Sequence, residues 1–575
     1  MAASPRGHAA PSPGPGRRGV IFGSSADPTI RRVPELVRPA RRFRTPTAAA
    51  VSFRAWVALC AGLVLLLRAP FFGTPLGVDE GGLAFVAEHW ASHGTAVYGS
   101  QWLDRPPLLV LAIRMAVDAA GATGVRALGA IAALAIVVLV ARLGALVGGP
   151  RAGRLAAVVA AVLASSIALQ AVYTPAELIA AVPASASVLC LVVALRSDRR
   201  DALVAAGALA SSAALVKQSF LDAGLAGLVF LIACAVSRAG RQRRTWPIAW
   251  AGGVALPLLA VALASGLGYV NGDALPYALI GFRLDALRTL GASGLPLTAR
   301  SAKLMTPALA SGLAVAMLLV PFGLLRARHD RVIAATLTAW LAGGLAGVAG
   351  GGTYWPHYLI EVVPVTAILA GIAIAAMPAG VRGALVGATV ALAVGGAIGA
   401  IGYVSDRRPH DVERAVGSYI HANAHPGDTQ YVLYGRANVL FYGGVPTPFP
   451  YDWSLMVRAR PGARVALYRL LASPRRPTWV VPWQDDDWWH LDRGDLVDRL
   501  LKEHYRVAAT IDGHPILRRI DLRRSPPGCG VSYSSAPTAP RPGRPRAAPR
   551  ASGPAACRAG TTPRRAPPGT PSPRR

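Results

Sequence analysis

Charged residues are scarce in this sequence. They make up 15% of the 575 residues, whereas soluble proteins carry about a quarter. The shortage lies in residues 55–403, where apolar runs alternate with basic residues, and 53% of the whole chain is hydrophobic. This pattern excludes an ordinary soluble domain and predicts an α-helical polytopic membrane protein.

Several common catalytic and structural motifs are absent. The five cysteines show no metal-ligand spacing and no disulfide framework. His-Glu-x-x-His, Cys-x-x-Cys, Walker and Gly-x-Ser-x-Gly motifs are also missing. Hydrolysis by zinc or serine, and pumping driven by ATP, therefore lose their usual support. A cleavable signal pattern is not visible either, because the first apolar run starts late and others follow it.

The net charge of +31 comes mostly from the two ends of the chain. Residues 1–54 hold ten arginines against two acids, and residues 523–575 hold eleven arginines and no acid, so these ends supply +8 and +11. Their Pro, Ser, Ala and Gly content predicts a disordered N-terminal arm (1–52) and a disordered tail (523–575). No nucleic-acid-reading module accompanies them, so we expect no nucleic-acid partner.

Eleven apolar segments are candidates for spans of the membrane domain, residues 53–403. A span needs about 20 mostly apolar residues. The candidates are 53–72, 125–146, 153–171, 178–195, 202–217, 219–236, 247–268, 303–325, 332–349, 358–377 and 384–403.

Basic loops between these segments predict which side faces the cytoplasm. The alternation is consistent only if residues 73–124 form one large outer loop, so the apolar segment 107–120 must not cross. It starts with Pro106-Pro107 and carries Arg114 and Asp118, which favours a helix lying in the outer face. Residues 404–522 then follow on the extracytoplasmic side of the cell membrane.

Composition changes after residue 403 and predicts a small outer α/β domain over 404–522. Residues 411–422 and 491–504 have helical patterns, whereas 430–434, 478–482 and 506–511 resemble strands. The domain has no glycine-rich phosphate turn, so it is not predicted to bind a nucleotide.

Asp79 and Glu80 are adjacent acids just after the first span, in Gly77-Val78-Asp79-Glu80-Gly81-Gly82. A carboxylate there is suited to take a proton from an attacking hydroxyl or amine, and Asp79 is the catalytic candidate. Glu80 is a candidate to hold the acceptor or a divalent cation, although no cofactor is required by the sequence. A solvated acidic turn is the alternative interpretation.

Further candidates for binding substrate lie on the same predicted face. Arg105 precedes Pro106-Pro107 and is suited to bind a phosphate through two hydrogen bonds. Glu177 opens a span, and Lys217-Gln218 stands at a helix end. Ionisable groups at membrane depth are costly and point to function, while snorkelling and helix capping are the alternatives.

His357-Tyr358 begins the tenth span after three glycines. The histidine is suited to donate to a leaving phosphate or a sugar hydroxyl, although a lone histidine is more often structural. Asp485–His490 could grip a sugar or a cation, with a solvated loop as the alternative. The sequence therefore names a substrate-binding set around Asp79, and no metal ligands.

The order of these motifs resembles a known family. Asp79-Glu80-Gly81 followed by Arg105-Pro106-Pro107-Leu108 is similar to the Asp-Glu…Lys-Pro-Pro-Leu signature of membrane glycosyltransferases with the GT-C fold, in the branch of protein mannosyltransferases and aminoarabinose transferases (families 39 and 83). Pro175–Leu178, Leu215–Gln218 and His357–Pro364 resemble later motifs of that branch. Arg105 stands where the family has Lys, and Glu177 where it often has Asp.

The resemblance implies a polyprenyl-phosphate-linked sugar as donor and a glycan, lipid or protein as acceptor, at the outer face of the cytoplasmic membrane. It places the family's catalytic aspartate on Asp79 and its phosphate-contacting cation on Arg105. Two other classes remain open from the residues alone: a polytopic transporter or lipid-linked sugar flippase, and a catalytically silent scaffold. Loss of transfer on replacing Asp79 would separate the enzyme from both.

Overall fold

The computed structural model describes residues 51–90, 97–237, 244–292, 297–484, 491–492 and 494–521. The arm up to residue 50, the arginine-rich tail and the Asp485–His490 motif lie outside these described residues. The chain divides into two units, residues 1–519 and 520–575, and the first contains all the elements discussed below.

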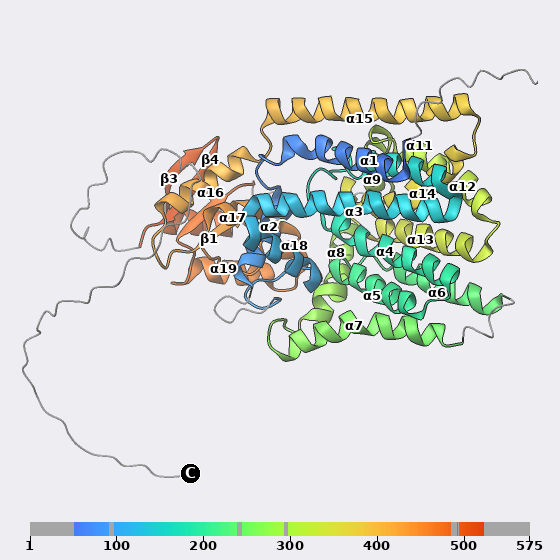
Figure 1. The fold of residues 1–575 in the computed structure, drawn as a ribbon. Coiled ribbons are helices and arrows are strands. Elements are labelled where there is room, and N and C mark those ends of the chain that lie inside the picture. Colours follow the sequence, from blue (N-terminus) through green and yellow to red (C-terminus); the bar gives the residue numbers. More distant parts are fainter. Residues whose placement is uncertain are drawn as a thin grey trace, which may run out of the picture. The chain divides into compact units, whose positions relative to one another are not determined.

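The membrane part is built from helices. Hydrocarbon offers the backbone no hydrogen-bonding partner, so long apolar segments satisfy it internally as helices. They are α1 (Phe53–Arg68), η1 (Ala69–Phe71), α2 (Val78–His89), α3 (Pro107–Leu163), α4 (Ala176–Ser197), α5 (Arg200–Val216), α6 (Asp222–Val236), α7 (Trp246–Gly266), η4 (Tyr277–Gly281), α8 (Phe282–Gly291), α9 (Leu297–Ser301), η5 (Ala302–Leu304), α10 (Met305–Ala310), α11 (Leu313–Leu318), α12 (Val320–Ala327), α13 (Arg331–Gly350), η6 (Pro356–Val362), α14 (Val363–Ala375) and α15 (Ala379–Arg407). Figure 1 shows most of the long helices running side by side.

The predicted count of eleven spans is not confirmed, although the polytopic helical fold is. Each predicted segment overlaps a helix, but among the described residues seven helices are long and apolar enough to cross a membrane, or eight with one bent pair. The difference has a physical origin. Helices α5 and α6 have only 17 and 15 residues, and the segment from Thr298 to Ala327 is bent by 91°.

Helix α3 is in fact three helices joined at two sharp corners. Its backbone leaves helical geometry at Ala120 and Gly121 (φ 55°) and again at Gly149 (φ 86°), directly before Pro150. A Cβ on Gly124 would lie 1.9 Å from the carbonyl oxygen of Ala116, although residues eight apart in one straight helix are about 12 Å apart. The first corner therefore separates the segment before Ala120 from the next span, as the sequence predicts. Its position against the bilayer stays a prediction.

Helices α5 and α7 approach each other closely at two glycines. A Cβ on Gly207 would lie 2.1 Å from the carbonyl oxygen of Trp250, and one on Gly253 would lie 2.0 Å from that of Val204. Small residues at such crossings let membrane helices pack backbone against backbone. This explains why glycine stands at positions 207 and 253.

Replacing Gly253 by Ala is expected to destabilise the protein, because the new methyl group would force α5 and α7 apart. Overpacking of this kind costs about 1–3 kcal/mol. The neighbouring Gly252→Ala is the matched control, since nothing lies within 4 Å of its Cβ position. Thermal unfolding of the two variants in detergent measures the difference, and equal midpoints would contradict this packing.

The C-terminal part contains a four-stranded sheet in the order β1-β2-β4-β3. The strands are β1 (Gln430–Leu433), β2 (Trp479–Pro482), β3 (Tyr505–Ile511) and β4 (His514–Arg519), with β1 and β2 parallel and the other pairs antiparallel. The helices are α16 (Asp411–Asn423), α17 (Ala437–Gly443), α18 (Ser454–Ala459), α19 (Ala463–Ala472) and α20 (Leu496–His504). The predicted α/β class is confirmed.

Both faces of this sheet are covered. Val432 packs with α16 and α17, whereas its neighbours Tyr431 and Leu433 pack with α19 and α20, as the alternation of side chains along a strand requires. The helix predicted from residue 491 begins instead at Leu496. The reason is Asp492, whose carboxylate accepts hydrogen bonds from the backbone N–H groups of the first turn of α20. Strand β4 and helices α17 to α19 are additions to the predicted elements.

Candidate active site

Asp79 and Glu80 lie in the first turn of α2 rather than in a loop. The Glu80 carboxylate accepts a hydrogen bond from the backbone N–H of Gly77 (2.8 Å), which caps the start of the helix. Two acids at this position are also stabilised by the positive end of the helix dipole. The Asp-Glu pair is therefore both a helix start and a candidate site.

The two acids point in different directions. Glu80 is 4% exposed, and its Oε1 accepts from Arg126 Nη1 and from the backbone N–H of Thr174, both at 2.6 Å. Asp79 is exposed. Both oxygens of Glu80 are thus engaged within the protein, and Asp79 offers the accessible carboxylate.

Asp79 contacts one side chain of the C-terminal part and lies near two from the membrane part. Trp453 Nε1 donates a hydrogen bond to Asp79 Oδ1 (3.0 Å). Asp79 also interacts electrostatically with Arg105 and with His357. These contacts place the catalytic candidate beside two predicted substrate-binding residues.

Arg105 is held by Asp104, which it shares with Arg283. Arg105 Nη1 lies 2.6 Å from Asp104 Oδ1, and Arg283 Nη2 lies 2.7 Å from Asp104 Oδ2. Burial alone would raise the pKa of Asp104, but the two guanidinium groups lower it below its usual value. Two cations therefore share one carboxylate, and one positive charge is left in excess next to Asp79.

The pKa of Arg105 is raised although burial lowers it. The charge of Asp104 makes the largest opposing contribution, followed by Asp79, Tyr358 and Glu177. The same loop is fixed from other sides, because the Tyr98 hydroxyl donates to the carbonyl oxygen of Arg105 (2.6 Å) and Gln218 Nε2 donates to that of Asp104 (2.8 Å).

Four more predicted residues form one buried cluster. The Lys217 ammonium pairs with Glu177 Oε1 and lies 4.5 Å from the centre of the Tyr358 ring. His357 Nε2 lies 3.7 Å from the same Glu177 oxygen, and its Nδ1 lies 2.7 Å from Gln170 Oε1. Each of these residues stands at a helix terminus: Glu177 in the first turn of α4, Lys217 at the end of α5, and His357 and Tyr358 in η6.

The structure therefore brings the sequence-predicted residues to one set of helix ends. Asp79, Arg105 and His357 interact through their charges, and Gln218, Glu177, Lys217 and Tyr358 contact them or their neighbours. Glu80 lies next to the set but faces Arg126. Their roles remain predictions.

A metal centre is not evident in the part of the chain that the structure describes. Those residues contain no group of three or more His, Cys, Asp or Glu side chains that could hold a metal ion. The divalent cation remains a prediction without a defined ligand set.

Sequence reasoning missed several residues. Trp453 is separated from Asp79 by 374 positions and carried no signal, whereas Arg283 lies between the predicted spans 247–268 and 303–325 and Asp104 directly precedes Arg105. Two further acids lie deep between helices. The Trp340 indole donates to Asp222 (2.8 Å) and the Ser219 hydroxyl donates to Glu361 (2.9 Å). Asp222 and Glu361 could each have been found in the sequence as an acidic residue within an apolar run.

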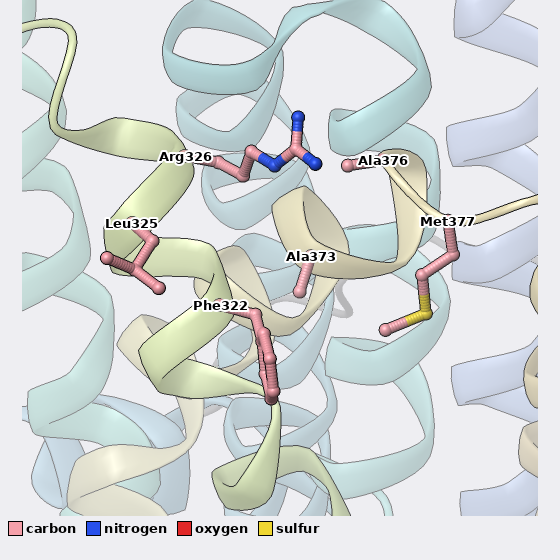
Figure 2. Close-up of a pocket in the computed structure, with 6 residues that line it drawn as sticks. All are labelled: Phe322, Leu325, Arg326, Ala373, Ala376 and Met377. Carbon is pink, nitrogen blue, oxygen red and sulfur yellow. The ribbon is translucent and has the colours of Figure 1, made fainter.

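A cavity of about 230 Å³ lies between α12 and α14. Figure 2 shows Phe322, Leu325 and Arg326 on one side and Ala373, Ala376 and Met377 on the other. It is at the far end of the helical segment that starts at Pro356 and spans 20 residues, about 30 Å from His357. None of its lining residues belongs to the candidate site.

One segment of the chain matches a family model. Residues 104–264 match the family model described as dolichyl-phosphate-mannose-protein mannosyltransferase, a range that includes Arg105, Glu177, Lys217 and Gln218. A search of curated proteins finds no match.

Solved structures match over most of the chain. ArnT from Cupriavidus metallidurans bound to undecaprenyl phosphate is 16% identical, with a TM-score of 0.59 over 82% of this chain and 99% of ArnT. The apo state of ArnT gives 14% identity and a TM-score of 0.58 over 81% and 98%. The Archaeoglobus fulgidus oligosaccharyltransferase is 13% identical, with a TM-score of 0.48 over 80% and 73%.

The match to ArnT confirms the fold class predicted from the sequence: the chain has the GT-C fold of membrane-embedded glycosyltransferases. Taken with the family model over residues 104–264, it confirms the predicted enzyme class, a membrane glycosyltransferase.

Proposed function

We propose that this protein transfers a sugar from a polyprenyl-phosphate carrier to a glycan, lipid or protein acceptor at the outer face of the cytoplasmic membrane. One observation carries the proposal: an exposed carboxylate, Asp79, lies beside the Arg105–Asp104–Arg283 group with its excess positive charge. Support for the donor comes from ArnT, which was solved with undecaprenyl phosphate, and from the dolichyl phosphate in the name of the family model.

The chemistry follows from these two groups. The acceptor oxygen or nitrogen forms a bond to the anomeric carbon while Asp79 takes its proton. The bond from the anomeric carbon to the phosphate oxygen breaks, and the electron pair leaves with the lipid phosphate. Arg105, whose planar fork matches a phosphate, stabilises that charge, with Arg283 beside it.

Lys217 supports this step from the second cluster. Its amino group is paired with Glu177 and lies over the Tyr358 ring, so Glu177 and Tyr358 position Lys217 near the leaving group. His357 Nδ1 donates to Gln170 Oε1, so Nε2 of the neutral ring is available to accept a hydrogen bond from a sugar hydroxyl.

The function is tested by comparing envelope glycans, lipids and glycoproteins from cells with and without the gene by mass spectrometry. If the protein is a transferase, cells without the gene should lack one sugar modification. The purified protein should also form the glycosylated product from a polyprenyl-phosphate sugar. A flippase would move the lipid-linked sugar across vesicles without forming a new glycosidic bond. A scaffold would do neither, and either result would overturn the proposal.

Arg105→Ala is expected to reduce kcat/KM for the donor about 10- to 100-fold, because a hydrogen bond between charged groups is worth about 1.5–3 kcal/mol. The loss should appear mainly as a raised KM for the donor, with the KM for the acceptor nearly unchanged. Arg105→Lys should recover part of it, since the charge returns without the bidentate fork.

Arg288→Ala is the matched control for this prediction. Its side chain is 78% exposed and pairs with Asp285, between the same two predicted spans as Arg283, so donor kinetics should be unaffected. Equal losses toward donor and acceptor in Arg105→Ala would contradict the phosphate role.

A further inference from the structure

The C-terminal part lies directly against α2, the helix that carries Asp79. A Cβ on Gly81 would lie 2.4 Å from Cβ of Asn438 in α17, and one on Gly82 would lie 2.5 Å from Cζ2 of Trp453. Both are closer than real side-chain contacts allow, so the two glycines after Asp79-Glu80 create the space that this contact needs. Figure 1 shows α2 between α3 and the C-terminal helices.

The chain just before α2 is held by the same domain. The backbone N–H of Leu76 donates to the Tyr442 hydroxyl oxygen (2.6 Å), and Asn438 Nδ2 donates to the carbonyl oxygen of Leu76 (3.1 Å). Both polar backbone groups of Leu76 are thus bonded to α17. The start of α2 has little freedom to move relative to the C-terminal part.

Trp453 completes this contact at the catalytic candidate itself. Its indole N–H donates to Asp79 Oδ1, and among the described residues no other hydrogen bond to this carboxylate is found. One oxygen is fixed by the indole, and Oδ2 is left for an incoming acceptor.

We propose that Trp453 is a positioning residue for Asp79, through which the C-terminal domain completes the catalytic site. This rests on the proposed function, in which Asp79 takes the proton of the acceptor. The indole holds Oδ1, the rigid contact at Gly81 and Gly82 holds the indole, and the carboxylate keeps one orientation before the acceptor arrives. Fixing a reacting group in this way lowers the barrier by removing its freedom in advance.

Trp453→Phe tests the proposal because it keeps an aromatic ring over Gly82 and removes only the donor. We expect kcat to fall about tenfold with the donor KM unchanged. The kcat should fall even at temperatures well below the unfolding midpoint of the variant, where the protein is fully folded. A purely structural contact would lower thermal stability and leave kcat of the folded protein unchanged.

Trp90→Phe is the matched control. Trp90 Nε1 donates to the carbonyl oxygen of Tyr269 at 2.7 Å, so the variant also loses one indole hydrogen bond, at the other end of α2, and should keep the wild-type kcat. Gly82→Ala is a second test, made on α2 rather than on Trp453, because its methyl group displaces the indole. Combined with Trp453→Phe, it should lower kcat less than the product of the two single losses.

The outcomes separate this inference from the function on which it rests. Wild-type kcat in Trp453→Phe would overturn the positioning role, while Asp79→Asn still removed activity. Full activity of Asp79→Asn would instead overturn the proposed function, and the positioning role with it.

Discussion

Asp79→Asn is expected to reduce the rate of sugar transfer about a thousandfold, within the range of roughly 10²–10⁴ that a positioned general base contributes. The asparagine is nearly the same size, and its Oδ1 still accepts from Trp453, so the site should keep its shape. What is lost is the basic oxygen that takes the proton from the acceptor. Initial rates with purified protein, a polyprenyl-phosphate sugar and the acceptor measure the effect.

Asp201→Asn is the control for this substitution. Asp201 makes the same exchange at an exposed position, where it pairs with Arg199, and its variant should transfer sugar at the wild-type rate. The amount of each protein in the membrane must match, because Asp79→Asn is expected to insert normally. Activity of Asp79→Asn within a few-fold of wild type would refute the assigned base.

Replacing Arg126 by Met is expected to destabilise the protein by about 3–5 kcal/mol, because it leaves the Glu80 carboxylate buried without its counter-charge. The pair is only 2% and 5% exposed and is 2.6 Å apart. The Arg126 guanidinium also donates to the carbonyl oxygen of Pro75 (2.7 Å) and lies 4.9 Å from the centre of the Tyr173 ring. Thermal or denaturant unfolding in detergent gives the change in the free energy of unfolding.

Two further variants test whether the buried charge of Glu80 causes this destabilisation. Glu80→Gln in the Arg126→Met background removes the stranded charge and keeps an acceptor for the Thr174 N–H, so the double variant should be more stable than Arg126→Met alone. Arg199→Met breaks an exposed pair with Asp201, and pairs of that kind are worth about 0–1 kcal/mol. If Arg126→Met and Arg199→Met had similar effects, the buried pair would not hold the start of α2.

Much of the fold was predictable because one requirement dominates it, the satisfaction of backbone hydrogen bonds within the membrane. Long apolar segments must be helical in a membrane, and corners such as Gly149-Pro150 are visible as helix breakers. The number of spans was not predictable, because short helices such as α6 and the bent segment before Ala327 have the composition of a span without its length or straightness.

The candidate site was predictable to the extent that its residues stand at helix ends. Glu177, Lys217 and His357 each border an apolar run on the same predicted side, so alternation of the spans brings them together. The sequence did not reveal which of Asp79 and Glu80 is buried and which is exposed. Neighbours on a helix are rotated by about 100°, which turns Glu80 toward Arg126 and leaves Asp79 outside, and only the exact start of α2 decides which acid is which.

Trp453 illustrates a second limit of prediction from the sequence. Its contact with Asp79 depends on how the sheet domain docks, and the glycines at positions 81 and 82 acquire a meaning only when α17 and Trp453 are placed against them. Sequence patterns describe what one segment prefers, whereas this contact joins segments 374 positions apart.

The acids between the helices have a consequence for biogenesis. Asp222 belongs to α6, and Glu361 to η6, and a Cβ on Gly343 or Gly347 of α13 would collide with one or the other. A carboxylate at the centre of a membrane helix costs about 2.5–3.5 kcal/mol on insertion scales, and less near a helix end such as the position of Asp222. During synthesis α6 therefore gains from staying beside the insertion machinery until α13, with its indole donor Trp340, emerges more than a hundred residues later.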